Sequence, residues 1–294
     1  MKKIGLVLSG GFGKGAYQVG ALQALREVFR PEDFSAVSAA SIGALNTYAY
    51  LTGILDEAAD LWESVDFKGS MRSVVSVMRS TLLRDAIGRH VSDTVLPMPF
   101  YVPLVNATDR TFDYHNFSRL SKEELLKYFD AAISLPLVNS GVSIGDGVFF
   151  DGGLIDNIPV APLVKMPLDY IICIYFDEMY TFEDARTDRN SIKITFPDDT
   201  IISTSVDIRH DSIHYMVGEG YRRTREILDF MFSEGPENID AVLCNIARYN
   251  EQAPKPKMRI TMDVVITNLN KVMRKLDRKK RTEASEAPSR EGKD

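Results

Sequence analysis

The sequence predicts an α/β fold with a mainly parallel central sheet, and three observations support this prediction. Ile4–Leu8 is a short apolar run, and after a glycine-rich loop apolar residues recur at helical spacing as far as Phe29. A second strand-like segment, Phe34–Ser38, leads directly into a second helical pattern, Ile42–Leu51. Tyr170–Phe176 is apolar throughout, which is typical of a central strand covered on both faces. Strands and helices that alternate in this way favour parallel pairing through crossover helices.

The other segments extend the same pattern. Pro31 ends the first helix and Gly53 ends the second, and residues 55–95 are predicted to form a helical insertion. From Met262 to Leu276 apolar residues lie three and four apart, which predicts a helix that packs on the body or pairs with a second copy. Further strands are expected at Phe100–Ala107, Val148–Phe150 and Ile192–Phe196, and further helices at Ser121–Tyr128, Asp211–Phe232 and Ile239–Tyr249.

The composition is that of a globular protein with an acidic balance. The chain of 294 residues has a formal charge of −6, which argues against nucleic acid as a partner. Its two cysteines, Cys173 and Cys244, make neither a disulfide framework nor a zinc site and fit a reducing compartment. The apolar stretch near the N-terminus is too short for a signal peptide, and no run approaches the ~18 residues of a membrane-spanning helix. We therefore expect a soluble, cytoplasmic protein.

A serine with small neighbours lies between the second strand and the second helix. The residues two before and two after Ser41 are Ala39 and Gly43, and small residues there allow the sharp turn of a nucleophile elbow. The helix that begins at Ile42 would point its first amides at the serine and favour developing negative charge. The alternative is that Ser41 is only the N-cap of this helix.

The loop Gly10–Gly15 contains four glycines, so its backbone N–H groups can converge on an anion. A Walker phosphate loop requires Ser or Thr after its lysine, but Gly15 follows Lys14. A dinucleotide-binding loop requires an acidic residue about 20 positions further on, where Ser38–Ala40 stands instead. An oxyanion hole is therefore favoured over a phosphate site.

The third motif is an aspartate at the end of a strand. Asp151 is followed by Gly152 and Gly153, and this pattern predicts a tight turn that presents the carboxylate rather than burying it in a core. The alternative is an ordinary Asp-Gly hairpin turn.

In this order and spacing, the three motifs resemble those of the patatin family of lipid acyl hydrolases. The resemblance spans about residues 4–165 and includes Ala132–Pro136 as a further block before the aspartate. It implies a three-layer α/β/α fold, with 4–165 as the catalytic core and 166–281 completing the same domain, while the polar stretch 282–294 is expected to be disordered. The matching residues are Lys14-Gly15-Ala16-Tyr17 with Gly20, Ser41 to Asn46, and Asp151-Gly152-Gly153 with Asn157 and Pro159.

The resemblance implies a serine–aspartate dyad that works without histidine, metal or cofactor. The serine attacks an ester carbonyl, the aspartate accepts its proton, and water releases the acyl-enzyme. A lipid or acyl-ester substrate and peripheral contact with a membrane are implied, while the oligomeric state stays open. The implied residues are Ser41 and Asp151 as catalytic groups, the amides of Gly10, Gly11, Phe12 and Gly13 as oxyanion donors, and Lys14, Gly15, Gly43, Gly152 and Gly153 as supports.

Two positions depart from the family pattern. Phe12 stands where the family has the third glycine of the loop, and a phenylalanine resists positive φ, although Gly13 beside it could restore the flexibility. Ala39 replaces the first elbow glycine and adds only a methyl group. The Phe12 departure bears on activity towards bulky phospholipids and not on the reaction class.

Three alternatives compete with this interpretation. Ser41, Asp151 and either His210 or His214 follow the chain order of an α/β-hydrolase triad, although that fold normally places several strands before its elbow and only one strand precedes this elbow. A non-catalytic lipid-binding homologue, with Phe12 plugging the oxyanion hole, is the second. A nucleotide-binding module is the third.

Two segments bear on contact with lipid. Met71–Leu83 combines apolar residues with two arginines and is expected to be either a mobile cover near the acyl pocket or a surface helix of the core. Arg274–Arg281 holds six Lys or Arg against one Asp. This cluster either steers the protein to anionic lipid or ends a solvated helix.

Overall fold

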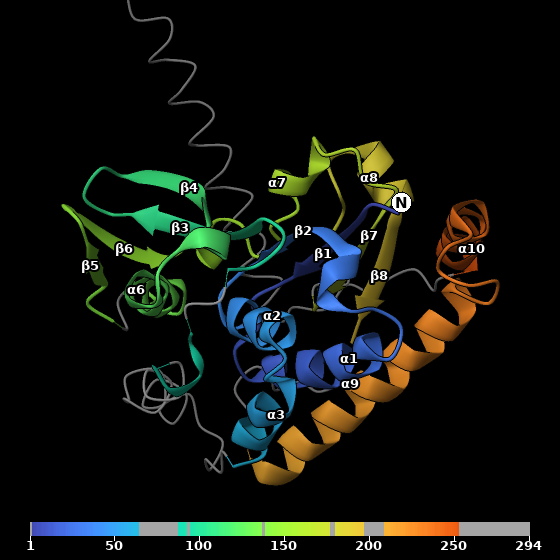
Figure 1. The fold of residues 1–294 in the computed structure, drawn as a ribbon, viewed down its shortest axis with the longest axis horizontal. Coiled ribbons are helices and arrows are strands. Elements are labelled where there is room, and N and C mark those ends of the chain that lie inside the picture. Colours follow the sequence, from blue (N-terminus) through green and yellow to red (C-terminus); the bar gives the residue numbers. More distant parts are fainter. Residues whose placement is uncertain are drawn as a thin grey trace, which may run out of the picture.

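An eight-stranded sheet forms the centre of the structure and confirms the predicted α/β fold with a mainly parallel sheet (Figure 1). Its strands are β1 (Ile4–Leu8), β2 (Phe34–Ala39), β3 (Phe100–Asn106), β4 (Thr111–Asn116), β5 (Val142–Ile144), β6 (Gly147–Asp151), β7 (Tyr170–Tyr175) and β8 (Ser191–Thr195). Their order is β5-β6-β3-β2-β1-β7-β8, with β4 paired to β3. The five from β3 to β8 pair in parallel, and β4, β5 and β6 pair antiparallel. This computed structural model describes residues 2–64, 88–92, 95–136, 139–176, 180–196 and 209–252.

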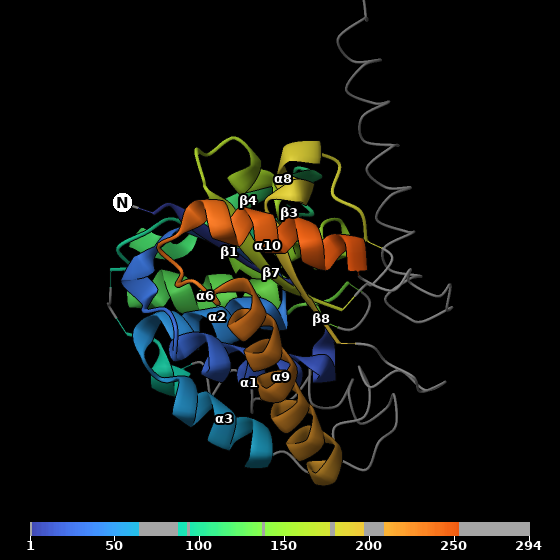
Figure 2. The same ribbon diagram turned by 90° about the vertical axis from the view of Figure 1, so that its right-hand side faces the viewer.

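Helices cover both faces of the sheet and make the three layers that the sequence predicts (Figures 1 and 2). On one face lie α1 (Gly15–Arg26), α2 (Ile42–Thr52), α3 (Leu55–Ser64), α6 (Lys122–Ala132) and α9 (His210–Met231). The other face carries α7 (Ala161–Val164) and α8 (Ala185–Arg189), and α10 (Ile239–Gln252) lies beyond the β8 edge.

Buried residues of the central strands alternate between two hydrophobic clusters. In β1, Leu6 and Leu8 belong to the cluster with α1, α2 and α9, whereas Val7 belongs to the cluster with α7. In β7, Ile172 and Cys173 alternate in the same way. Both faces of these strands are therefore covered, which explains their uninterrupted apolar sequence. Cys173 is a free, fully buried thiol, as its position in the apolar run predicts.

Two strands, β4 and β5, were not expected from the sequence. Both belong to the antiparallel part of the sheet, where β4 runs back along β3 from Thr111 to Asn116. None of the β4 residues is fully buried, so the strand has no apolar run that a sequence pattern could reveal. Its pairing with β3 comes instead from the tight turn that joins the two strands.

Some predictions lie outside the described residues. α3 begins the predicted helical insertion, but residues 65–87, which include Met71–Leu83, are not described. The same holds for the helix Met262–Leu276, for the basic cluster Arg274–Arg281 and for the polar tail 282–294.

Helices α1 and α9 are far apart in the sequence, and they cross each other at a pair of glycines. A Cβ on Gly20 would lie 1.9 Å from Val217 O, and a Cβ on Gly220 would lie 2.1 Å from Tyr17 O. Both obstructing atoms are backbone, so neither can move aside without shifting a helix. Glycine at these two positions allows the backbones of α1 and α9 to touch.

We expect Gly220→Ala to destabilise the protein by about 1–3 kcal/mol, because the added methyl group must push α9 away from α1. Gly218→Ala is the matched control on the same helix, since nothing lies within 4 Å of its Cβ position. Alanine there should stabilise the protein by about 0.5–1 kcal/mol through helix propensity. Urea denaturation of both variants measures the difference. Equal stabilities would contradict the close crossing.

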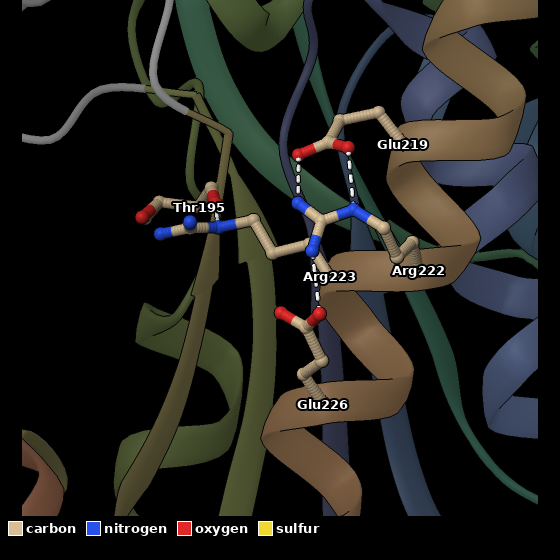
Figure 3. A network of polar contacts seen from close by, with 5 residues as sticks. All are labelled: Thr195, Glu219, Arg222, Arg223 and Glu226. Atoms are coloured by element: carbon tan, nitrogen blue, oxygen red, sulfur yellow. Dashed lines mark hydrogen bonds and ion pairs between the residues drawn. The ribbon is translucent and has the colours of Figure 1, made fainter.

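Side-chain contacts add to the attachment of α9 (Figure 3). Arg222 donates to Glu219 at 2.7 and 2.9 Å and to Glu226 at 2.5 Å, all along one exposed side of the helix. Arg223 reaches across to the sheet and donates to the backbone carbonyl of Thr195 at the end of β8. The Arg222 contacts stay within α9 and are open to solvent, so of these two arginines it is Arg223 that joins this helix to the sheet.

Candidate active site

Ser41 occupies the turn between β2 and α2 in a strained conformation. Its φ of 52° and ψ of −132° are unusual for a residue with a side chain, and Ser41 is only 8% exposed. It stands at the N-cap position, but its side chain makes no capping hydrogen bond. The side chain is instead hydrogen-bonded to Asp151. The interpretation of Ser41 as only a helix cap is therefore wrong.

The sheet topology brings this serine to Asp151. β4 pairs with one side of β3 along its length, so β2 and β6 share the other side. Ser38 of β2 lies opposite Tyr101, and Asp151 of β6 lies opposite Leu104, three residues further along β3. Because β6 runs antiparallel to β3, the carboxyl ends of β2 and β6 approach each other. The turn that follows β2 therefore places Ser41 beside the end of β6.

Asp151 lies in a buried position with a defined set of hydrogen bonds. Its N–H donates to Ser134 O at 2.8 Å, and its Oδ1 accepts the Gly153 N–H at 2.7 Å. The first contact gives the Ala132–Pro136 block a structural role, because its Ser134 carbonyl holds the backbone of Asp151 in place. A helical turn, Gly152–Leu154, follows the aspartate and leads to α7, so no hairpin forms there.

Burial sets the protonation of Asp151. The side chain is only 1% exposed, which corrects the expectation that the carboxylate is presented rather than buried. This desolvation raises the pKa of Asp151 to about 7, against the hydrogen bonds from Ser41 and Gly153, which lower it. A carboxylate with a pKa near neutrality can both accept and return a proton at physiological pH.

The glycine loop lies against the same serine, but its four expected donors are not equivalent. The Gly10 N–H donates to Asn157 O at 3.2 Å, so this amide is already bonded and is not available to an oxyanion. Phe12 and Gly13 begin a short helical turn that ends at Lys14, and the first amides of such a turn have no partner within it.

Phe12 takes the positive φ that the loop requires. Its φ is 50°, in the left-handed region, whereas Gly13 is not among the described glycines with positive φ. The expectation that Gly13 would restore the flexibility is therefore wrong. A phenylalanine in this region costs on the order of 1–3 kcal/mol, which the surrounding packing must offset. Of the three described non-glycine residues with positive φ, Phe12 and Ser41 both lie in this site.

Three positions around the serine require glycine, because neighbouring atoms lie too close to leave room for a Cβ. A Cβ on Gly10 would lie 2.9 Å from Ser41 Cβ, and one on Gly43 would lie 2.4 Å from Ser9 O. A Cβ on Gly152 would lie 2.4 Å from the Pro103 carbonyl carbon. These contacts let the glycine loop, α2 and the aspartate turn close on one point.

Lys14 is buried, with 1% of its surface exposed, so it is not a solvated surface lysine. Its Nζ lies 5.7 Å from the centre of the Phe176 ring, which provides a cation–π contact. A Cβ on Gly11 would lie 2.4 Å from the same ring. Lys14 and Phe176 therefore pack against the glycine loop and support its shape.

Sequence reasoning left Asn157 and Gln18 without a role. Asn157 donates from Nδ2 to Gly10 O at 3.3 Å and accepts the Gly10 N–H at its own carbonyl, so it joins the glycine loop to the aspartate turn. Gln18 is fully buried within α1 and donates to Ser9 O. A polar residue on an otherwise apolar, buried stretch of helix was the signal that could have revealed it.

The described histidines lie away from the Ser41–Asp151 pair. His210 and His214 lie on α9, more than half exposed, and their nearest acidic partners at 3.7 Å are Asp211 and Glu63. His115 on β4 packs against aromatic rings, and its burial lowers its pKa. Within the part of the chain that the structure describes, no hydrogen bond joins a histidine to Ser41 or Asp151.

Two further features, metal-binding groups and membrane-spanning helices, concern the described residues alone. No group of three or more His, Cys, Asp or Glu among them is arranged to hold a metal ion. None of the helices they form is both long and apolar enough to cross a membrane.

Known proteins resemble this chain in sequence over part of their length. Lysophospholipase NTE1 of Cryptococcus neoformans is 27% identical over 188 residues, which cover 59% of this chain and 11% of that protein. An uncharacterised NTE family protein of Mycobacterium tuberculosis is 25% identical over 181 residues, which cover 58% of this chain and 48% of that protein. The chain thus spans less than half the length of these relatives.

Two solved structures match this chain over most of its length. Human GIVD cytosolic phospholipase A2 in complex with methyl gamma-linolenyl fluorophosphonate matches with a TM-score of 0.48 at 9% identity, covering 85% of this chain and 60% of that one. VipD from Legionella pneumophila matches with a TM-score of 0.41 at 14% identity, covering 78% of this chain and 66% of that one.

The family model of patatin-like phospholipases matches residues 6–164, which hold every motif of the site and make up just over half of the chain. The chain therefore belongs to the patatin-like phospholipase family.

Proposed function

We propose that this protein is a serine hydrolase that cleaves the acyl ester bonds of lipids, with Ser41 as nucleophile and Asp151 as its base. The observation that supports this best is the hydrogen bond between a serine in a strained turn and a buried carboxylate whose pKa lies near 7. Membership of the family supports a lipid substrate, and the fungal relative is named a lysophospholipase.

In the first half of the reaction, Ser41 Oγ attacks the ester carbonyl carbon and its proton passes to the Asp151 carboxylate. The carbonyl oxygen becomes an oxyanion, which the amides of Gly11, Phe12 and Gly13 stabilise together with the N-terminal end of α2. Gly10 is left out of this set because its N–H is bonded to Asn157. When the intermediate collapses, the alcohol leaves with the proton from Asp151, and the acyl group stays on Ser41.

In the second half, Asp151 takes a proton from water while the water oxygen attacks the acyl-enzyme. The tetrahedral intermediate uses the same amide donors and collapses to release the carboxylic acid, and the proton returns to Ser41. Each proton therefore moves between Ser41, Asp151, water and the leaving alcohol. The carboxylate needs a pKa near neutrality because it acts in turn as base and acid. Lipid esters lie in membranes or micelles, so the proposal includes peripheral contact with a lipid surface.

A fluorophosphonate probe tests this function directly. Ser41 Oγ should form a bond to phosphorus with loss of fluoride, and mass mapping should find the label on Ser41 alone. Ser143, an exposed serine on β5, provides the control, because Ser143→Ala should label like the wild type while Ser41→Ala should not label. Release of fatty acid from lysophospholipid micelles should follow the same pattern. A wild-type chain that neither labels nor turns over such esters would leave lipid binding without catalysis as the better account.

A further inference from the structure

Buried polar side chains connect the glycine loop to the helix that begins after Ser41. The indole N–H of Trp62 donates to Asn46 Oδ1 at 3.1 Å, and Asn46 Nδ2 donates to Gly15 O and to Gln18 Oε1, both at 3.0 Å. Gln18 Nε2 in turn donates to Ser9 O at 2.6 Å. Gln18 is fully buried and Asn46 is 2% exposed, so water does not compete for the bonds that these two amides make with each other and with the carbonyls of Ser9 and Gly15.

This series of hydrogen bonds has only one consistent direction. It begins at the Trp62 indole, which can only donate, and it ends at the carbonyls of Ser9 and Gly15, which can only accept. Turning over the amide of Asn46 or Gln18 would set donor against donor and leave buried groups unpaired. Such unpaired groups cost about 1–3 kcal/mol each. The two amides therefore hold each other and the loop carbonyls in a single arrangement.

The two accepting carbonyls bracket the glycine loop. Ser9 O precedes the loop and Gly15 O follows it, so residues 10–14 are held at both ends by side chains from α1 and α2. Asn46 lies on α2, the helix that has Ser41 at its N-cap position. The hydrogen bonds therefore fix the loop amides relative to the serine oxygen. In Figure 1, α3, which carries Trp62, lies beside α1 and α2.

We propose that Asn46, together with Gln18 and Trp62, is the positioning group that sets the oxyanion loop against Ser41. This inference rests on the proposed function, since it assigns these residues to the stabilisation of the oxyanion. None of the three touches the reacting atoms, and they act through the carbonyls of Ser9 and Gly15. Loss of the bonds allows the loop to drift, and a displacement of about 1 Å can cost ~10²-fold in rate.

Asn46→Ala tests the role, with Asn245→Ala as the matched control. Asn245 is also a buried asparagine whose Nδ2 donates to two carbonyl oxygens, in this case the backbone carbonyls of Phe230 and Met231, but it lies on α10. Both variants should lose comparable stability. Only Asn46→Ala should lower kcat for a lysophospholipid, by about 10–100-fold, with KM nearly unchanged, because the lost interaction acts in the transition state. The milder Trp62→Phe keeps an aromatic ring but removes the indole N–H together with the second ring, and it should lower kcat by about 3–10-fold.

Trp62 also supplies a signal that reports on the bonds themselves. It is the only tryptophan in the chain, so the emission spectrum belongs to it alone. Asn46→Ala should shift this emission, and Asn245→Ala should not.

The outcomes separate this inference from the proposed function. An inactive wild type would overturn both. If the wild type hydrolyses the ester and Ser41→Ala abolishes the activity, the function stands and the variants decide the inference. It is overturned if Asn46→Ala and Trp62→Phe keep the wild-type kcat, if Asn245→Ala loses as much kcat as Asn46→Ala, or if Asn46→Ala leaves the emission unchanged. A loss of kcat confined to Asn46→Ala and Trp62→Phe supports it.

Discussion

Ser41→Ala is expected to lower kcat/KM for lysophospholipid hydrolysis by about 10⁴-fold or more, because no acyl-enzyme can form without the hydroxyl oxygen. The variant should remain folded, since the Ser41 side chain makes no capping bond to α2. The substitution removes one hydrogen bond to Asp151, and the melting temperature should stay close to that of the wild type. Initial rates measured over a range of substrate concentrations give the effect.

Ser143→Ala serves as the control for this measurement and should keep the wild-type kcat/KM, because Ser143 is exposed on β5. If Ser41→Ala retained most of the activity while staying folded by circular dichroism, Ser41 would not be the nucleophile.

Asp151→Asn should lower kcat/KM by about 10²–10⁴-fold, the usual contribution of a general base. The amide keeps the shape of the side chain but cannot accept the serine proton. In the wild type, kcat/KM should rise with pH and level off above about 7, because burial raises the pKa of Asp151 to about 7 and only the ionised form is a base. The rate of Asp151→Asn should lack this rise. A wild-type profile that is flat from pH 5 to 9 would contradict the assignment.

The same substitution should make the protein more stable. The folded-state pKa of Asp151 is raised above the ordinary value of 3.8, so the protonated carboxyl favours the fold. That contribution is complete below pH ~4 and is lost as the pH rises to about 7. Asparagine stays neutral, so Asp151→Asn should exceed the wild type in free energy of unfolding by on the order of a few kcal/mol at pH 8. The difference should shrink as the pH falls to 4.

Because Asp151 is buried, the pH profile is not expected to distinguish a serine–aspartate dyad from a triad with histidine, although the ordinary pKa values of aspartate and histidine differ. A histidine with an unperturbed pKa of ~6.5 would give nearly the same pH profile as a carboxylate whose pKa is about 7. The midpoint therefore does not separate a dyad from a triad. Glutamine replacements do, because each described histidine lies away from Ser41, and each variant should keep most of the wild-type kcat/KM. These four replacements are His90→Gln, His115→Gln, His210→Gln and His214→Gln.

The central strands and the first helices could be predicted because their local patterns and their tertiary environment agree. Ile4–Leu8 and Tyr170–Tyr175 are apolar throughout and are buried on both faces. Gly53 ends α2 with a φ of 79°, a conformation that glycine adopts without strain. β4 could not be predicted in this way, because a half-exposed strand at the side of a sheet needs no apolar run.

By itself, the sequence determined which residues gather at the site. Local backbone geometry requires the glycines of the loop, the small residues around Ser41 and the two glycines after Asp151. Such geometry depends on residues that are neighbours in the chain, so a sequence pattern can reveal it. Only the tertiary structure decided how those residues are bonded. In the folded protein the Gly10 N–H donates to Asn157 O, and the burial of Asp151 raises the pKa of its carboxyl group to about 7. These properties depend on desolvation and on partners that are distant in the chain, which no short sequence pattern contains.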